Sequence, residues 1–196
     1  MPVLVILIGY LLGSIPFGLI LTKLAGAGDL RAIGSGSIGA TNVLRTGRKG
    51  LAAGTLLLDG AKGFVAVLVG AALLPGIGGP LGGVMALVGH CYPVWLRFNG
   101  GKGVASLLGV ALALYWPAVI VFAVVWLVMA GVTRISSLGG MSAAVAMPVA
   151  AFVMGRGELV TPFAAMAALV LWKHRPNIQR LIKGTESRIG QKTPTA

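Results

Sequence analysis

Two glycine-rich segments of the sequence carry the hydroxyl and basic side chains that bind phosphate in many proteins. The first is Gly34–Arg45, whose residues 34–39 fit the spacing G-x-G-x-x-G. A dinucleotide-binding fold needs a strand before these glycines, whereas a long apolar run precedes them here. The glycines can instead turn backbone N–H groups toward an anion, with hydroxyls nearby and Arg45 as a bidentate phosphate clamp. A flexible connector with a topology-setting arginine fits the composition equally well.

The second segment, Gly89–Gly103, places Lys102 between two glycines. It lacks the P-loop spacing because Leu96 stands where G-x-x-x-x-G-K needs glycine, and Gly103 replaces the serine or threonine. A lysine at a membrane interface can meet a phosphate as a point charge, or it can simply fix topology. His90, late in an apolar run, is better explained as a buried, hydrogen-bonded histidine than as a ligand.

A third polar segment, His174–Glu186, follows the last apolar run. Residues 177–183 are predicted to form a short interfacial helix with its apolar side chains toward lipid. His174 is placed to titrate near neutral pH, with an interface anchor as the alternative. Asp59 and Lys62, three residues apart in the second apolar run, would be costly in a bilayer as isolated charges. They are either a structural pair or groups that face a wet interior.

Composition limits the class of protein. The chain is 57% hydrophobic with 31 glycines, and its 16 Lys and Arg against 4 Asp and Glu give a net charge of +12. A soluble nucleic-acid-binding protein of that charge needs a polar surface, which this composition does not provide. The two histidines, one cysteine and four carboxylates are mostly scattered and form no ligand cluster. We therefore predict an all-α integral membrane protein in a lipid bilayer, with no metal, no cofactor and no nucleic-acid partner.

Seven transmembrane helices are predicted, in a single membrane domain covering residues 1–196. The expected spans are residues 3–24, 51–74, 80–96, 104–115, 117–130, 136–155 and 159–173, followed by a polar tail at 185–196. The stretch 104–130 is long for one span, and we interpret it as a hairpin broken at Trp116-Pro117. That topology puts 14 of the 16 basic residues on one side, leaving Lys62 in a span and Arg156 opposite. The positive-inside rule then predicts an outside N-terminus, a cytoplasmic C-terminus, and all three polar segments at the cytoplasmic face.

Close helix contacts are also predicted from small residues. Gly9 and Gly13 have the G-x-x-x-G spacing, and Gly78/Gly82 and Gly79/Gly83 repeat it. Glycine at this spacing lets helix backbones approach closely in lipid.

The three polar segments occur in order and together resemble the motifs of the bacterial membrane glycerol-3-phosphate acyltransferases that use acyl-phosphate donors. The matching strings are G-S-G-x-x-G-A-T-N-x-x-R, H-x-Y-P…G-G-K-G and H-R-x-N-I-x-R-L-x-x-G-x-E, and Leu58-Asp59-x-x-Lys62-Gly63 also matches. The resemblance covers nearly the whole chain. It implies a multi-pass enzyme of the bacterial cytoplasmic (inner) membrane that catalyses the first acylation of phospholipid biosynthesis. A fatty acyl chain would pass from acyl-phosphate to the 1-hydroxyl of sn-glycerol 3-phosphate, giving lysophosphatidic acid and phosphate.

Carried over by position, the essential residues of the family fall on Ser35, Arg45, Lys102, His174 and Asn177. Substrate contacts are expected from Gly34, Gly36, Ser37, Gly39, Thr41, Asn42, Gly100, Gly101, Gly103 and Ser137. The remaining motif positions, with a structural or unassigned role, are Asp59, Lys62, His90 and Glu186, the last as an anchor. Ser37 stands where the family usually has asparagine, and Gly140 stands where it often has a second serine. The H-x-x-x-x-D signature of acyltransferases that use acyl-CoA or acyl-carrier protein is absent, because Trp95 and Gln179 stand five residues after the two histidines.

The expected mechanism is acyl transfer at the water interface. Arg45 and Lys102 would hold phosphate groups, and electrostatic neutralisation of the leaving phosphate would supply much of the rate. His174 and Asn177 would orient the glycerol hydroxyl or the donor carbonyl. The base is either His174 or a substrate phosphate, and a covalent acyl-Ser35 is a third route. A small transporter and an assembly subunit without chemistry are the competing classes, although the repeated halves typical of transporters are absent from the sequence. Chain-length preference and oligomeric state are not defined by the sequence.

Overall fold

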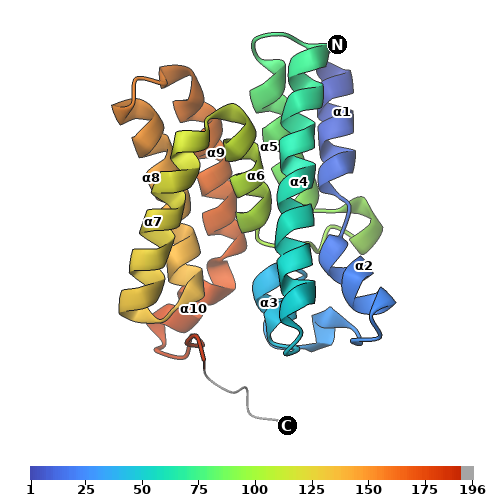
Figure 1. The fold of residues 1–196 in the computed structure, drawn as a ribbon, viewed down its shortest axis with the longest axis vertical. Coiled ribbons are helices and arrows are strands. Elements are labelled where there is room, and N and C mark those ends of the chain that lie inside the picture. The colour runs from blue at the N-terminus through green and yellow to red at the C-terminus, as the bar shows by residue number, and fades with distance from the viewer. Residues whose placement is uncertain (191–196) are drawn as a thin grey trace. The chain divides into compact units, whose positions relative to one another are not determined.

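Helices make up all the regular structure in residues 1–190, which are the residues described by the computed structural model (Figure 1). In chain order they are α1 (Pro2–Gly13), α2 (Phe17–Leu24), the 3-10 helix η1 (Leu30–Ala32), α3 (Ala40–Leu44), α4 (Lys49–Leu73), α5 (Gly78–Cys91), the 3-10 helix η2 (Val94–Leu96), α6 (Val104–Leu114), α7 (Trp116–Thr133), α8 (Ser136–Val153), α9 (Gly157–Lys173) and α10 (Arg175–Ile182). The predicted all-α class is confirmed. The chain divides into two compact units, Met1–Pro117 and Ala118–Ala196.

Among residues 1–190, four helical segments are long and apolar enough to cross a membrane. They are Pro2–Leu24, Lys49–Leu73, Trp116–Thr133 and Ser136–Val153, and α6 is a shorter apolar helix. Seven crossings and the sidedness of the termini stay predictions.

The first unit is built around α4, against which α1, α5 and α6 pack (Figure 1). Glycines allow the backbones to touch. A Cβ at Gly9 would lie 2.7 Å from the carbonyl oxygen of Gly82, and one at Gly13 would collide with Ala86. On the other side of α5, Gly78 meets Gly70 of α4 in the same way. The close backbone contacts predicted from the G-x-x-x-G spacing are confirmed for Gly9/Gly13 and Gly78/Gly82, whereas Gly79 and Gly83 lie against side chains such as Val67.

The first predicted span, residues 3–24, is not one continuous helix. It breaks at Ser14–Pro16 between α1 and α2, because proline has no N–H to donate and its ring displaces the preceding turn. The carbonyl oxygens of Ser14 and Ile15 fall in the break. The indole of Trp95 donates to the Ser14 carbonyl at 2.9 Å, and the ammonium of Lys62 donates to the Ile15 carbonyl at 2.8 Å. Side chains from distant parts of the unit therefore replace the helical hydrogen bonds that the break removes.

Other predicted boundaries also shift. The expected span 80–96 ends as a helix at Cys91, ahead of Pro93, and continues only as the short η2. The break expected at Trp116-Pro117 occurs one residue earlier, at Tyr115. Pro117 then lies in the first turn of α7, where a missing N–H costs no helical hydrogen bond. This helix runs on to Thr133, beyond the expected end at residue 130.

A small hydrophobic cluster positions the first glycine-rich segment. Its buried members are Leu30, Ile38, Val43 and Ala52, and the partly buried Leu19, Leu51 and Leu96 pack against it. The cluster joins η1, α3 and the start of α4 to η2. The first two polar segments of the sequence are thereby held together in one unit.

In the second unit, α8 packs against α9, and Gly139 of α8 lies against Trp126 of α7. The helix predicted at 177–183 begins earlier, at Arg175, because Pro176 is accommodated in the first turn. The predicted polar tail starts as a bonded segment: the N–H of Ile189 donates to the Arg134 carbonyl at 2.6 Å. Its last part, residues 191–196, lies outside the described residues.

Candidate phosphate-binding and acyl-transfer sites

The first glycine-rich loop is organised from inside by Asn42. This side chain is 2% exposed, and its Nδ2 lies 2.8 to 2.9 Å from the carbonyl oxygens of Leu30, Ile33 and Ser37. Its Oδ1 accepts the backbone N–H of Ser35 at 3.1 Å. Asn42, expected to contact substrate, therefore has its polar atoms engaged with the loop backbone and fixes the shape of the loop.

Arg45 and Gly34 lie directly against each other. Gly34 has a left-handed φ of +55°, and a Cβ there would lie 2.6 Å from Arg45 Nη1 and 2.7 Å from Arg45 Cδ. The arginine side chain therefore crosses the loop at a position where only glycine leaves room. Ser35, Thr41 and Arg45 are exposed on this loop, whereas Ser37 and Gly39 are half-buried. A guanidinium beside an exposed hydroxyl is an arrangement suited to a phosphate group.

The second glycine-rich loop lies flat on the end of α5. The N–H groups of Gly100 and Gly101 donate to the carbonyl oxygens of Cys91 and His90, at 3.2 and 3.0 Å. A Cβ at Gly101 would collide with His90 Nε2. Gly103 has φ +86°, and a Cβ there would lie 2.6 Å from Leu87. These three glycines, expected to contact substrate, bring the loop against α5 and hold the half-buried Lys102 between fixed neighbours.

Asp59, Lys62 and His90 form a buried charged cluster beneath that loop. Their exposed fractions are 1%, 4% and 3%. Lys62 Nζ lies 2.8 Å from Asp59 Oδ1, which confirms the pair expected from their spacing. His90 Nδ1 lies 3.6 Å from the same oxygen, beyond hydrogen-bonding distance. The cluster thus joins α4 to α5.

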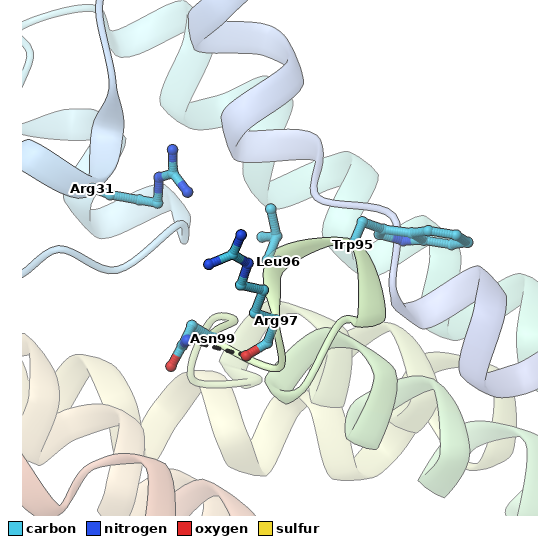
Figure 2. Close-up of a pocket in the computed structure, with 5 residues that line it drawn as sticks. All are labelled: Arg31, Trp95, Leu96, Arg97 and Asn99. Atoms are coloured by element: carbon cyan, nitrogen blue, oxygen red, sulfur yellow. Dashed lines mark hydrogen bonds between the residues drawn. The ribbon is translucent and has the colours of Figure 1, made fainter.

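A pocket of about 450 Å³ lies between η1 and the α5–α6 connection. Its lining residues are Arg31, Trp95, Leu96, Arg97 and Asn99. Figure 2 shows the two arginines extending toward each other from the two segments. Arg97 and Phe98 both have left-handed backbones, with φ of +50° and +62°, which is unfavourable for side chains of this kind. Sequence reasoning assigned no role to either arginine, although Arg31 stands three residues before Gly34.

The residues of the third motif lie in the second unit, where His174 and Asn177 are each 3% exposed. His174 Nδ1 lies 2.8 Å from the Val170 carbonyl. A carbonyl can only accept, so Nδ1 carries a proton and a neutral ring has its lone pair on Nε2. Asn177 Nδ2 donates to Glu186, while its Oδ1 is buried and has no hydrogen-bond partner among residues 1–190.

Glu186 collects three donors. Its Oε1 accepts from Ser137 Oγ at 2.7 Å and from Asn177 Nδ2 at 2.6 Å, and its Oε2 accepts from Arg180 Nε at 2.6 Å. Burial raises the pKa of this carboxyl, but the three hydrogen bonds and the charge of Arg180 outweigh it and hold the pKa below its ordinary value. Ser137, expected to contact substrate, therefore has its hydroxyl bonded to Glu186. The carboxylate ties the C-terminal segment to α8 and α10.

The structure thus brings the first and second motifs together in one unit and the third motif together in the other. Within the described part of the chain, no three histidine, cysteine or carboxylate side chains lie together in a way that could hold a metal ion. The fold and these sites define a helical membrane protein whose glycine-rich, basic loops suit phosphate-bearing ligands.

Known proteins share this sequence and this fold. The family model for glycerol-3-phosphate acyltransferase matches residues 3–184. A glycerol-3-phosphate acyltransferase of Rhodopseudomonas palustris (strain BisB5) is 56% identical over 187 residues, covering 95% of each chain. One from Mesorhizobium japonicum is 53% identical over 190 residues, covering 97% of each chain. The chain belongs to the glycerol-3-phosphate acyltransferase family, as its three motifs predict.

Two solved structures are similar over nearly their whole length. The first is a crystal structure of PlsY (YgiH), an integral membrane glycerol 3-phosphate acyltransferase, in its glycerol 3-phosphate form. It superposes with a TM-score of 0.90 at 36% identity and covers 96% of each chain. The lysophosphatidic acid form of PlsY gives a TM-score of 0.87 at 33% identity, covering 96% of this chain and 95% of that one. The chain is therefore an integral membrane acyltransferase, and the transporter and assembly-subunit alternatives lose their support.

Proposed function

We propose that this protein transfers a fatty acyl chain from acyl-phosphate to the 1-hydroxyl of sn-glycerol 3-phosphate, releasing lysophosphatidic acid and phosphate. This is the first acylation of phospholipid biosynthesis. The structural relatives are described in a glycerol 3-phosphate form and a lysophosphatidic acid form. These two molecules differ by one acyl chain on a hydroxyl, which supports the acceptor and product proposed here.

The observation that carries the proposal is the packing of Arg45 across Gly34, beside the exposed Ser35. A guanidinium held there offers a planar pair of donors to a phosphate, and the serine hydroxyl adds another. The second glycine-rich loop of the same unit carries Lys102, a second cation. Two cations on two glycine loops suit a reaction in which donor and acceptor each carry a phosphate.

The chemistry needs a base and a stabilised leaving group. The oxygen of the acceptor hydroxyl attacks the acyl carbon and forms an ester bond, and the bond from that carbon to the phosphate oxygen breaks. The hydroxyl proton passes to a base, and the phosphate departs with its charge neutralised by Arg45 and Lys102. The base is His174 through Nε2, since Nδ1 donates to Val170, or it is a substrate phosphate. A covalent acyl-Ser35 is the third route, and Asn42 Oδ1 at 3.5 Å from Ser35 Oγ is a weak acceptor rather than a base.

Asn177 supplies an acceptor in this scheme. Its Oδ1 is buried and lacks a hydrogen-bond partner among the described residues, and an unpaired buried carbonyl is costly. A glycerol hydroxyl that donates to this oxygen would remove that cost and orient the acceptor.

The enzyme is further proposed to cross the bacterial inner membrane seven times, with its N-terminus outside and its active site on the cytoplasmic face. In this topology α5 and α6 cross as short helices, which a bilayer tolerates where protein covers their ends. Cys91 is the only cysteine and is buried, so a Cys91→Ala background permits labelling of single cysteines. In intact spheroplasts, an impermeant maleimide should label Ile77→Cys and Glu158→Cys but spare Arg48→Cys and Lys183→Cys, all of which replace exposed residues. Labelling of Lys183→Cys before lysis would contradict the sidedness.

Purified protein in detergent tests the reaction directly. Palmitoyl-phosphate with glycerol 3-phosphate should release phosphate and form lysophosphatidic acid in equal amounts, whereas palmitoyl-CoA should support no transfer. An acceptor analogue that lacks the 1-hydroxyl should fail. Equal rates with the two donors, or phosphate release that does not depend on the acceptor, would overturn the proposal.

A further inference from the structure

An aspartate, a lysine and a histidine are buried close together in the first unit without a part in the proposed chemistry. Asp59, Lys62 and His90 are each less than 5% exposed. A buried ion pair is weak evidence for stability, because apolar residues of similar volume often stabilise a core as well or better. Charged residues within membrane helices are rare and usually functional. The contacts of this cluster show where such a function lies.

At one end of the cluster, His90 contacts the loop that carries Lys102. The imidazole of His90 has Asp59 on its Nδ1 side and Gly101 on its Nε2 side, so close that a Cβ at Gly101 would collide with the ring. The backbone of the loop also hydrogen-bonds to the His90 and Cys91 carbonyls. The backbone next to Lys102 therefore packs against the imidazole ring, and the other side of the ring lies against Asp59.

At the other end of the cluster, Lys62 contacts the break in the first span. Lys62 bonds to both Asp59 and the Ile15 carbonyl. Two more bonds fix the start of the α5–α6 connection to the same region: Tyr10 donates to the Tyr92 carbonyl at 2.8 Å, and Trp95 donates to the Ser14 carbonyl. Asp59 lies ten residues into α4, about 15 Å along the helix. Figure 1 shows the connection level with the middle of α4.

We propose that Lys62, Asp59 and His90 are positioning residues that act on the reaction through Lys102. They hold the Gly100–Gly103 loop at a fixed depth and angle against α5, and so set where the Lys102 ammonium meets a substrate phosphate. This inference rests on the proposed function, in which Lys102 contacts phosphate. A displacement of about 1 Å at such a group is enough to cost a large part of the rate.

A double-mutant cycle tests the path of this effect. His90→Gln should raise the KM for the phosphate-bearing substrates by about tenfold, a coupling of the size found between residues in contact. The same substitution added to Lys102→Ala should change KM no further, because its effect passes through the missing lysine. Additive losses in the two backgrounds would overturn the proposal. Thr55→Val is the matched control, since Thr55 is fully buried on α4 and its hydroxyl donates, within the described part of the chain, to the Leu51 carbonyl of its own helix.

Hydrogen exchange provides a readout that does not depend on activity. In wild-type protein the Gly100 and Gly101 amides should be protected, because each donates to α5. His90→Gln and the Asp59→Asn/Lys62→Met double variant should speed their exchange by at least tenfold, while Thr55→Val leaves it unchanged. The double variant avoids leaving one buried charge without its partner.

The two proposals fail in different ways. If the His90 and Asp59/Lys62 variants exchange faster at Gly100 and Gly101, but wild-type protein shows no activity with acyl-phosphate, the proposed function is overturned. The contact between the cluster and the loop would still stand. Unchanged exchange in variants that remain folded, or an unchanged KM per folded molecule, would overturn the positioning role. Wild-type kinetics in Lys102→Ala would overturn both.

Discussion

The amide nitrogen of Asn177 donates to Oε1 of Glu186 across 2.6 Å. A carboxylate only accepts, so this contact fixes the orientation of the amide and turns Oδ1 away as the remaining acceptor. Glu186 is itself held by Ser137 and Arg180. One motif residue thereby orients another, and the C-terminal segment completes the site of the third motif.

Replacing Asn177 with aspartate should destabilise the protein at neutral pH. The new carboxylate would face Glu186 at hydrogen-bonding distance, and two like charges there repel each other. We expect Asn177→Asp to unfold at a lower temperature than Asn177→Ala at pH 7.5 and to recover as the pH is lowered toward 5. Thermal unfolding in detergent measures this, with the exposed Asn99→Asp as control. Equal unfolding temperatures of the two Asn177 variants at pH 7.5 would contradict the contact.

Acid should weaken the protein through Glu186. The folded pKa of this carboxyl lies below its ordinary value of 4.5, because three hydrogen bonds outweigh the effect of burial. Its stabilising contribution is therefore complete above about pH 4.5 and is lost as the pH falls through the folded pKa. Glu186→Gln should flatten this part of the stability profile between pH 5 and 3. Glu158→Gln, at an exposed ion pair with Arg156, should change the profile much less.

Arg45→Ala should impair catalysis far more than Arg48→Ala. Both arginines are exposed, but Arg45 lies across the glycine loop whereas Arg48 donates to the Ala25 carbonyl. Loss of hydrogen bonds to a charged group costs about 1.5–3 kcal/mol, or roughly a 10- to 150-fold fall in kcat/KM for Arg45→Ala. Steady-state kinetics with both substrates varied provides the comparison. Similar losses in the two variants would show that Arg45 serves topology alone.

The pH profile of His174→Gln separates the two candidate bases. If His174 takes the proton, its loss should lower kcat by about 10²–10⁴-fold and remove the acidic limb of the profile. Should a substrate phosphate act instead, the variant would keep the wild-type profile with a modest loss, and the histidine-base version would be wrong. Acyl-enzyme trapping with acyl-phosphate alone, read by mass spectrometry, checks the covalent Ser35 route in the same samples.

Gly13→Ala should strongly destabilise the first unit. A Cβ at this position would collide with the backbone of Ala86, and backbone cannot move aside as a side chain can. Overpacking of this kind costs about 1–3 kcal/mol or more, so the unfolding temperature should fall by several degrees. Gly131→Ala is the control, because nothing lies within 4 Å of a Cβ there. An unfolding temperature of Gly13→Ala equal to that of the control would refute the close contact between α1 and α5.

Much of the fold could be predicted from the sequence, because membrane helices and glycine-lined contacts leave local signals. The G-x-x-x-G pairs identified the α1–α5 contact, and the i, i+3 spacing identified the pair of Asp59 with Lys62. Trp116-Pro117 indicated a helix break that occurs one residue earlier, at Tyr115. In each case the structure follows from an interaction between residues close in sequence, or from small residues that let two helix backbones come close.

What could not be predicted depends on contacts between distant segments. Asn42 looks like a substrate residue in the motif, yet its amide nitrogen donates hydrogen bonds to backbone carbonyls, including that of Leu30, twelve residues earlier. The Gly100–Gly103 glycines look like a phosphate loop, yet they face α5. Pro16 indicates the helix break from the sequence. The side chains that donate to the carbonyls of the break, Lys62 and Trp95, lie 47 and 81 residues from their acceptors. No local sequence pattern predicts hydrogen-bond partners that lie so far apart in the chain.

The break between α1 and α2 has a consequence for how the protein is made. The first span leaves the ribosome before either of its donors has been synthesised, since chains emerge from the N-terminus. The Ile15 carbonyl accepts the Phe17 N–H at 3.2 Å and gains Lys62 later, whereas the Ser14 carbonyl gains its side-chain donor only when Trp95 has been synthesised. The hydrogen bonding of the break between α1 and α2 is thus completed only after Trp95 has been synthesised.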